Sequence, residues 1–216
     1  MSNIDKSRFR LPPVYPITDS RISGLSHTEQ VRRLIDGGAR FIQLREKHVA
    51  ARDFFRDASA AISYAHQNQA LIVINDRIDI AVATGADGVH LGQTDLPPEA
   101  ARRLLGNDAI IGFSTHSVEQ LKDALRMPID YIAIGPIFPT STKENPNPTV
   151  GIDGITMAKY FVGDTPLVAI GGITAANAKS VLVRGADSAA IISDLLRKPR
   201  EISNRYQEML NIVCQG

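Results

Sequence analysis

Charged and amide side chains follow a short apolar segment of this sequence at alternating positions. The segment ends Gln43-Leu44-Arg45-Glu46-Lys47, so in an extended chain Gln43, Arg45 and Lys47 point to the same side. The alternative is a solvated strand end with ordinary surface charges. An amide and two cations gathered inside a structure are costly without an anion. The pattern therefore favours an anion-binding site.

Two aspartates follow the next two apolar segments. Asp76 follows Asn75 directly, and Asp95 ends the run His90-Leu91-Gly92-Gln93-Thr94-Asp95. Each aspartate could instead cap the helix predicted after it. Taken together beside the cations, they favour a Mg²⁺ site, because Mg²⁺ takes one or two carboxylates and completes its shell with water and phosphate oxygens. His90 either contacts a ligand or only fills the interior, and the sequence leaves both open.

Small and hydroxyl residues follow the later apolar segments. Ser114 either donates to a phosphate or caps the helix predicted from Val118. Thr140, Ser141 and Thr142 precede a lysine, Lys143, in a proline-rich stretch that suits an anion. Further on stand a glycine pair ending in Gly172, and then Ile192 and Ser193, where backbone amides can approach a phosphate closely.

The candidate residues fall into two anion-binding groups. Arg45, Lys47, Asn75 and Lys143, with a metal on the two aspartates, suit a diphosphate, whereas Thr140, Thr142, Gly172 and Ser193 suit a monophosphate. No Ser-His-Asp, Cys-His or paired general-acid carboxylate arrangement stands out. We therefore expect no catalytic nucleophile or general base, and expect positioning and leaving-group stabilisation to supply the rate.

Eight short apolar segments alternate with helical patterns, at intervals of about 25 residues. Their continuous apolar character is typical of parallel strands that are covered on both faces. The predicted strands are Val14–Thr18, Phe41–Arg45, Leu71–Asn75, Gly88–Leu91, Ala109–Phe113, Tyr131–Ile134, Leu167–Ile170 and Ser188–Ile192. The predicted helices are Thr28–Asp36, Ala51–Gln67, Ile78–Ala83, Pro98–Leu105, Val118–Arg126, Ile155–Phe161, Ala175–Val183 and Glu201–Ile212.

Eight strand–helix units predict an α/β fold, a single (β/α)₈ TIM barrel over residues 1–216. The alternative is an open doubly wound sheet, but its G-x-G-x-x-G fingerprint is absent after the first strand. Residues 1–12 are expected to form an N-terminal extension. Residues 135–154 form a long proline-rich loop that should lie with the site at the carboxyl ends of the strands.

The composition excludes several classes of protein. With 24 basic and 23 acidic residues among 216, the chain has no general basic field for nucleic acid. No apolar run is long enough to cross a membrane, and the charged N-terminal residues do not form a secretory signal. The one cysteine, Cys214, excludes an intrachain disulfide. We expect a cytoplasmic protein with no nucleic-acid or membrane partner, and leave a homo-oligomer open.

The combination of these motifs resembles thiamine-phosphate synthase (thiamine-phosphate pyrophosphorylase). The motifs that carry the resemblance are Gln43–Lys47, Ile74–Arg77, Gly88–Gln93 with Asp95, Gly135–Lys143 and Ala169–Ile173. It implies a transferase of thiamine biosynthesis that joins hydroxymethylpyrimidine diphosphate to thiazole phosphate and releases diphosphate by a Mg²⁺-assisted dissociative substitution. Its partners would be these two small-molecule substrates, and its cofactor Mg²⁺.

The resemblance also assigns site residues. It implies that the pyrimidine diphosphate is held by Gln43, Arg45, Lys47, Asn75, Ser114 and Lys143, to which we add Glu46 from the same motif. It implies Asp76 and Asp95 as Mg²⁺ ligands. The implied thiazole-phosphate residues are Thr140, Thr142, Gly172, Ile192 (through its backbone) and Ser193, to which we add Ser141.

Two departures from the family pattern and two other functions remain. Thr94 stands where an acidic residue is common, and Phe113 stands where a smaller aliphatic residue usually precedes the serine. A thiazole tautomerase-type isomerase would share the barrel but has less need of a magnesium-diphosphate group. A non-catalytic metabolite sensor would share every ligand residue.

Overall fold

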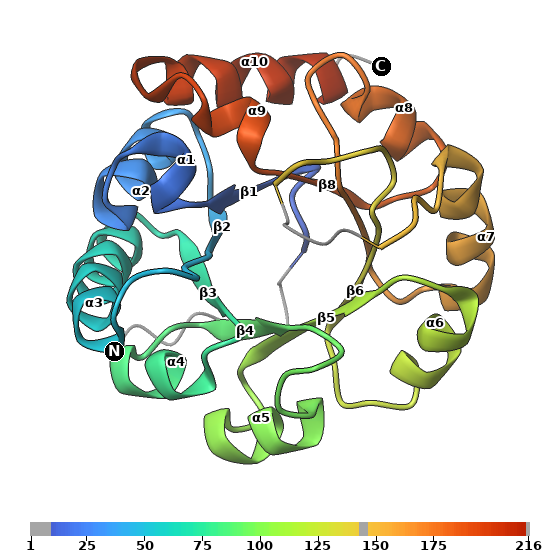
Figure 1. Ribbon diagram of the computed structural model, residues 1–216, viewed down its shortest axis with the longest axis horizontal. Coiled ribbons are helices and arrows are strands. Elements are labelled where there is room, and N and C mark those ends of the chain that lie inside the picture. The colour runs from blue at the N-terminus through green and yellow to red at the C-terminus, as the bar shows by residue number, and fades with distance from the viewer. Residues whose placement is uncertain (1–9, 143–146, 215–216) are drawn as a thin grey trace.

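The computed structural model describes residues 10–142 and 147–214. Within them, eight parallel strands pair in chain order, and β8 pairs with β1 to close a barrel (Figure 1). The predicted TIM barrel is confirmed. The strands are β1 (Val14–Thr18), β2 (Phe41–Leu44), β3 (Leu71–Asn75), β4 (Gly88–Leu91), β5 (Ile110–Thr115), β6 (Tyr131–Ile134), β7 (Leu167–Ile170) and β8 (Ser188–Ile191).

Helices surround the barrel on its outside (Figure 1). They are α1 (Ser20–Ser23), α2 (His27–Asp36), α3 (Ala51–Gln67), α4 (Ile78–Thr84), α5 (Pro98–Leu105), α6 (Val118–Ala124), α7 (Ile152–Val162), α8 (Ala178–Val183), α9 (Ser193–Leu196) and α10 (Ile202–Cys214). The sequence did not predict α1, α9 or the 3₁₀ turn Pro199–Glu201, which are too short to carry an apolar period. Helix α7 begins at Ile152, three residues before the predicted start.

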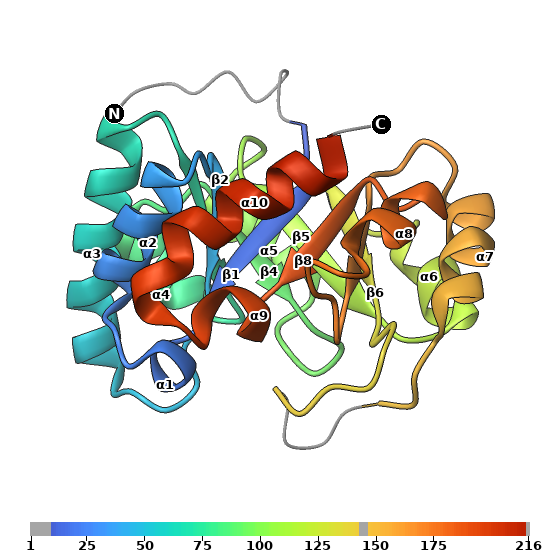
Figure 2. The same cartoon turned by 90° about the horizontal axis from the view of Figure 1, so that it is seen from above.

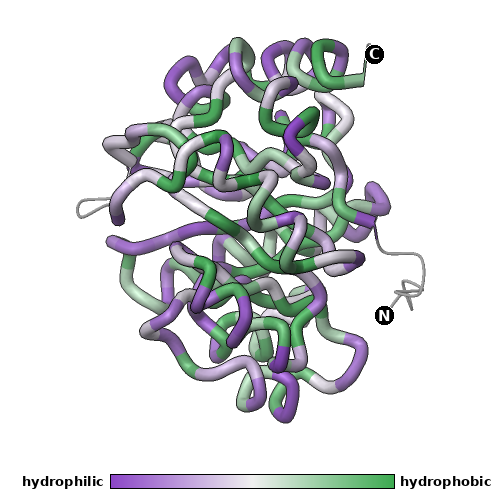
Figure 3. Tube along the Cα trace, turned by 90° about the vertical axis from the view of Figure 1, so that its right-hand side faces the viewer, coloured by the Kyte–Doolittle hydropathy of each residue, from purple (hydrophilic) through white to green (hydrophobic). Residues whose placement is uncertain are grey.

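Side chains of the strands alternate between two buried layers. Tyr15 and Ile17 of β1 lie inside the barrel, whereas Val14 packs between the barrel and the helices. Both layers exclude water, and this explains why the strands are apolar throughout. Along the chain, hydrophobic segments run through the interior and hydrophilic ones gather at the outer turns (Figure 3). The inner cluster of nine buried hydrophobic residues includes two tyrosines, Tyr15 and Tyr131.

The connections that follow the strands share one end of the barrel. Figure 2 shows the segment after β6 at the same end as α1 and α9, which follow β1 and β8. Residues predicted for the site stand after the strands, so the fold gathers them at this end. No helix among the described residues is long and apolar enough to span a bilayer.

Candidate active site

A cavity of about 460 Å³ opens at the carboxyl ends of the strands. Residues from seven strand ends and from the loop after β6 line it, which is the arrangement expected of TIM-barrel active sites. The predicted site residues found in its lining are Gln43, Arg45, Lys47, Asn75, Asp76, Asp95, Ser114, Thr140, Thr142, Gly172, Ile192 and Ser193. The alternation that puts Gln43, Arg45 and Lys47 on one side thus brings all three to the cavity.

Three of the predicted site residues are not in this list. Glu46 and Ser141 are not in the lining. Glu46 is buried beside the cavity, whereas Ser141 is exposed to solvent. Lys143 lies outside the described residues.

Arg45 is held by Asp19, which directly follows the neighbouring strand β1. Its Nη1 lies 2.5 Å from Oδ2 of Asp19, and both side chains are largely buried. The other carboxylate oxygen of Asp19 accepts the N–H groups of Arg21 and Ile22 at 3.1 and 3.2 Å, so Asp19 also caps α1. One carboxylate therefore fixes both the short helix and the direction of the Arg45 guanidinium.

Glu46 organises the turn that carries Lys47. Its Oε1 accepts the backbone N–H groups of Lys47 and His48 at 2.8 Å each, and Oε2 accepts from Ser20 and from His27 Nε2 at 3.2 Å. Burial would raise the pKa of Glu46, but the hydrogen bonds outweigh it and lower this pKa to about 2. The ionised Glu46 side chain therefore stabilises this turn and positions Lys47. It does not face the cavity.

The two predicted metal ligands lie next to each other. Asp76 adopts a left-handed backbone conformation (φ 61°), and its N–H donates to the His90 carbonyl at 2.8 Å. Conformations of this kind are costly for a non-glycine residue and recur at functional sites. The Asp76 carboxylate forms an ion pair with Lys47. Asp95 Oδ2 accepts the N–H of Gly92 at 2.7 Å.

Neither aspartate caps the helix that follows it. The N-cap positions of α4 and α5 are Arg77 and Pro97, and neither helix has a side-chain cap. The helix-capping role that the sequence left open for both aspartates is therefore not observed.

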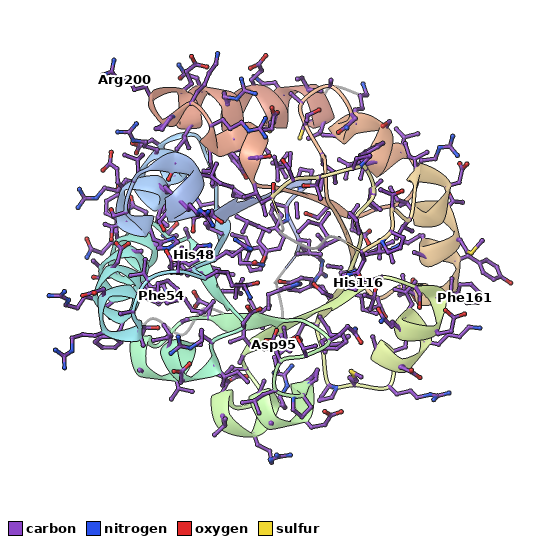
Figure 4. All side chains as sticks on the ribbon, in the orientation of Figure 1. His48, Phe54, Asp95, His116, Phe161 and Arg200 are labelled. Atoms are coloured by element: carbon purple, nitrogen blue, oxygen red, sulfur yellow. The ribbon has the colours of Figure 1, made fainter. Side chains whose placement is uncertain are left out.

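Figure 4 shows Asp95 and His116 near the opening of the barrel, and Phe161 and Arg200 in the outer ring of helices.

The surroundings of Asp95 disfavour the ionised form of its carboxyl group. Burial raises its pKa, and the neighbouring Asp76 carboxylate raises it further against the opposing effects of the Gly92 N–H and Lys47. Two adjacent carboxylates repel unless a proton or a cation lies between them. The described residues contain no cluster of three or more His, Cys, Asp or Glu side chains for a metal, so this pair would bind a cation only with help from water or substrate oxygens.

The opposite side of the cavity is built from backbone. Gly171 and Gly172 follow β7 with positive φ values of 102° and 65°. A Cβ on Gly172 would lie 2.6 Å from the Pro139 carbonyl oxygen, so only glycine fits there. The segment after β6 pairs with this turn, because Phe138 N–H donates to the Gly171 carbonyl at 3.0 Å. This pairing brings the threonine loop against the glycine turn.

Ser114 and His90 form a hydrogen-bonded pair that the sequence did not reveal. Ser114 Oγ lies 2.8 Å from His90 Nε2, and His90 Nδ1 lies 3.0 Å from the hydroxyl of Tyr131. In a nucleophilic triad a carboxylate occupies the place that the phenol takes here. Burial lowers the pKa of His90 to about 4, against the opposing charge of Asp76. His90 is a weak base, so the pair is not an activated nucleophile.

Several lining residues had no functional prediction. His116 is fixed by a 2.6 Å hydrogen bond from its Nδ1 to the Gly135 carbonyl, and its backbone N–H donates to Gln120. Asn147 reaches the cavity from the far side of the loop after β6. Strand alternation could have found Ala190, which lies two positions before the predicted Ile192. No local signal could have found Asn147, because its position depends on the path of a long loop.

Comparisons with known proteins agree with this geometry. A family profile described as thiamine monophosphate synthase matches residues 14–195. The chain is 40% identical over 210 residues to a thiamine-phosphate synthase of Koribacter versatilis (strain Ellin345), covering 95% of this chain and 99% of that protein. It is 43% identical over 207 residues to a thiamine-phosphate synthase of Chlorobium luteolum (strain DSM 273 / BCRC 81028 / 2530), covering 95% of this chain and 96% of the relative. A solved thiamine phosphate pyrophosphorylase from Pyrococcus furiosus superimposes with a TM-score of 0.84 at 34% identity, covering 94% of this chain and 95% of that one.

Proposed function

This chain belongs to the thiamine monophosphate synthase family. On that premise we propose which of its side chains bind each substrate and the metal ion. The enzyme is a transferase that joins hydroxymethylpyrimidine diphosphate to thiazole phosphate, giving thiamine phosphate and diphosphate. One observation carries the proposed division. A single cavity has cations and a carboxylate pair on one side, and a glycine turn with threonines on the other.

The first half of the cavity binds the pyrimidine diphosphate. Arg45 and Lys47 neutralise charge on the phosphate oxygens, and Asn75 adds an amide contact. The support for Arg45 is that Asp19 holds its guanidinium in a fixed direction, which lowers the entropy lost when a phosphate binds. Lys143 stays a prediction for the same group.

The carboxylate pair fits a hard divalent cation. Asp76 and Asp95 lie together at the mouth of the cavity, and burial beside Asp76 makes ionised Asp95 costly without a cation. Two carboxylates suffice for Mg²⁺, which keeps water and takes phosphate oxygens for its remaining positions. When bound, Mg²⁺ would supply positive charge that stabilises the departing diphosphate. Lys47, paired with Asp76, would then be free to turn toward the phosphates.

The second half of the cavity binds the thiazole phosphate. Gly172 leaves the backbone open to a close approach, and Thr140, Thr142 and Ser193 offer hydroxyl groups around it. Ile192 contributes through its backbone. Because the two halves share one cavity, the thiazole nitrogen can be held close to the pyrimidine methylene carbon as the diphosphate leaves.

The proposed route is a dissociative substitution. The diphosphate departs with the electron pair of its C–O bond, and the thiazole nitrogen then supplies the pair for the new C–N bond. The electron-rich aminopyrimidine ring stabilises the intervening methylene cation. The pairing of Ser114 with a histidine too weakly basic to activate it argues against a covalent route through this hydroxyl.

The test is an assay with both substrates and Mg²⁺. We expect diphosphate and thiamine phosphate in equal amounts, and no product without the metal ion. Turnover of the thiazole alone would support a tautomerase-type isomerase instead. Binding of both substrates without product would support a metabolite sensor. A cytoplasmic location belongs to the same proposal, and cell fractionation tests it.

A further inference from the structure

Five polar side chains form one continuous line of hydrogen bonds through the interior of the barrel. Gln43 Nε2 donates to the Tyr15 hydroxyl at 2.9 Å, and that hydroxyl lies 2.9 Å from the hydroxyl of Tyr131. The Tyr131 hydroxyl lies 3.0 Å from His90 Nδ1, and His90 Nε2 lies 2.8 Å from Ser114 Oγ. The line joins three residues of the cavity lining, Gln43, His90 and Ser114, through two tyrosines that are not part of the lining.

Four of the five side chains are shielded from water, so they depend on one another for their hydrogen bonds. Tyr15 and Tyr131 are 1% and 0% exposed, and Gln43 and His90 are 2% and 6% exposed. Burial raises the pKa of both phenols above their usual value, so both hydroxyls keep their protons. The fold makes room for this arrangement. A Cβ on Gly112 would lie 2.0 Å from Cζ of Tyr131, so glycine is required on β5 opposite the ring.

With the Gln43 amide nitrogen donating to Tyr15, counting donors sets the direction of every other bond in the line. The Tyr15 hydroxyl accepts from Gln43, so its own proton must be donated, and the Tyr131 oxygen is the partner in reach. The Tyr131 proton then goes to His90 Nδ1. His90 must therefore carry its proton on Nε2 and donate it to Ser114 Oγ. The Ser114 proton remains for a ligand.

The two ends of the line consequently present opposite polarity to the cavity. Ser114 offers a donor, while the Gln43 amide is held with its nitrogen toward Tyr15, so its carbonyl oxygen is turned away from that hydroxyl and can accept from a ligand. Reversing one end would require reversing all four bonds. We propose that Tyr15, Tyr131 and His90 are positioning residues that lock Ser114 as a donor and Gln43 as an acceptor, and that this lock selects an aminopyrimidine.

The chemistry of the ligand fits this polarity. An aminopyrimidine has a ring nitrogen that accepts a hydrogen bond and an exocyclic amino group that donates one. The corresponding oxopyrimidine has an N–H and a carbonyl instead, so its pattern is reversed. Sites built to match a hydrogen-bonding pattern reject the mismatched analogue strongly, because buried groups are then left unpaired. This inference rests on the proposed pyrimidine half of the cavity.

The first test measures discrimination between two substrates. We compare kcat/KM for the 4-amino and 4-oxo pyrimidine diphosphates in wild-type enzyme, Tyr15→Phe and Tyr131→Phe. Each variant removes one hydroxyl and keeps the ring. Without the lock, Gln43 and Ser114 can turn to suit either pattern, so we expect the preference for the amino compound to fall about 10-fold or more in both variants. The KM for thiazole phosphate should not change.

Tyr206→Phe is the matched control. Tyr206 is also buried, and its hydroxyl donates to the Val14 carbonyl at 3.1 Å outside the barrel. Its loss should lower thermal stability and leave the substrate preference unchanged. If the preference is the same in all three variants and wild type, or falls equally in Tyr206→Phe, the proposal is overturned.

The second test does not depend on turnover. In ligand-free wild-type protein, ¹⁵N NMR of His90 should show the Nε2–H tautomer, and Tyr131→Phe should show a mixture of both tautomers. A dominant Nδ1–H tautomer in wild type would overturn the proposal. If wild-type enzyme forms no thiamine phosphate, the proposed function fails, while the tautomer measurement still decides whether the lock exists.

Discussion

Three aspartates at the amino ends of the strands and one pair of aspartates at the carboxyl ends have opposite roles. At the amino ends of the strands, Asp87, Asp130 and Asp187 stand directly before β4, β6 and β8. Each Oδ2 accepts a backbone N–H of the preceding strand at 2.7 Å. Asp130 and Asp187 also form ion pairs with Arg102 and Lys159, which lie on the helices before β5 and β7. His66 Nε2, on the helix before β3, lies 3.0 Å from Oδ2 of Asp87. These carboxylates tie neighbouring strands and helices together.

At the carboxyl ends, Asp76 and Asp95 face each other at a cavity instead. Lys47 pairs with one of them, and the pKa of the other is raised by burial and by its neighbour. The contrast teaches that the partners, rather than the residue type, separate structural from functional carboxylates. An aspartate tied to backbone and a fixed cation stabilises the barrel, whereas a pair left close together stores repulsion that a ligand cation can relieve.

The largest expected effect is at the carboxyl end. Asp95→Asn should lower Mg²⁺-dependent turnover on the order of 100-fold or more, because it removes one of two candidate ligands. The folded-state pKa of Asp95 is raised, so its ionised form destabilises the fold at neutral pH, and the variant should be as stable as wild type or more so. Steady-state kinetics against Mg²⁺ concentration and thermal unfolding measure both. Unchanged magnesium dependence would refute the metal role.

Glu46 sharpens the comparison, because it is a structural carboxylate at the functional end. Its folded-state pKa of about 2 lies below the usual 4.5, since hydrogen bonds outweigh the cost of burial. The stabilisation it gives is therefore complete above about pH 5 and is lost as the pH falls toward 2. Glu46→Gln should lower the free energy of unfolding by about 2 kcal/mol at neutral pH.

Urea unfolding of Glu46→Gln and wild type at several pH values checks this prediction. The gap between the two proteins should close as the pH approaches 2. Glu29→Gln is the control, because Glu29 pairs with Arg33 on the surface of α2, and its gap should be small at every pH. A gap for Glu46 that does not change with pH would contradict a charged structural role.

At the amino end the expected effect is on stability alone. Asp130→Asn removes the ion pair with Arg102 at 2.9 Å and weakens the bond to the Ile111 N–H. We expect a loss of about 1 kcal/mol, since the pair is partly exposed to water. Turnover per folded molecule should equal that of wild type. A fall in kcat comparable to that of Asp95→Asn would abolish the distinction between the two ends.

The fold was predictable because burial on both faces leaves a strong local signal. Five of the eight strands have the predicted bounds, and the other three differ by one or two residues at one or both ends. The positions of Arg45 and Lys47 were also predictable. Side chains two positions apart in an extended chain point to the same side, so both follow the direction of Gln43 on β2. The sequence also repeats Gly-Ala-Asp before β4 and β8, but it did not reveal that the aspartates tie neighbouring strands.

The remaining features depend on partners far apart in the chain. Arg45 is fixed by Asp19, 26 positions away, and Tyr15 meets Tyr131 across 116 positions. No spacing rule links such pairs, because closure of the barrel creates the contact. Glu46 was assigned to the substrate because it stands within a strand-end motif. Its side chain instead turns into the fold, because three successive N–H groups, from Lys47 to Val49, all meet its Oε1.

The smallest expected effect comes from an aspartate that belongs to neither end. Asp53 lies on α3 and pairs with Arg56 at 2.5 Å, with side chains 52% and 72% exposed. Water screens such a pair, so Asp53→Asn should change the free energy of unfolding by no more than about 0.5 kcal/mol and leave kcat unchanged. Urea unfolding beside Asp130→Asn checks this. A loss as large as that of Asp130→Asn would mean that losing any ion pair costs the barrel equally, and that the ties to strand backbone add nothing.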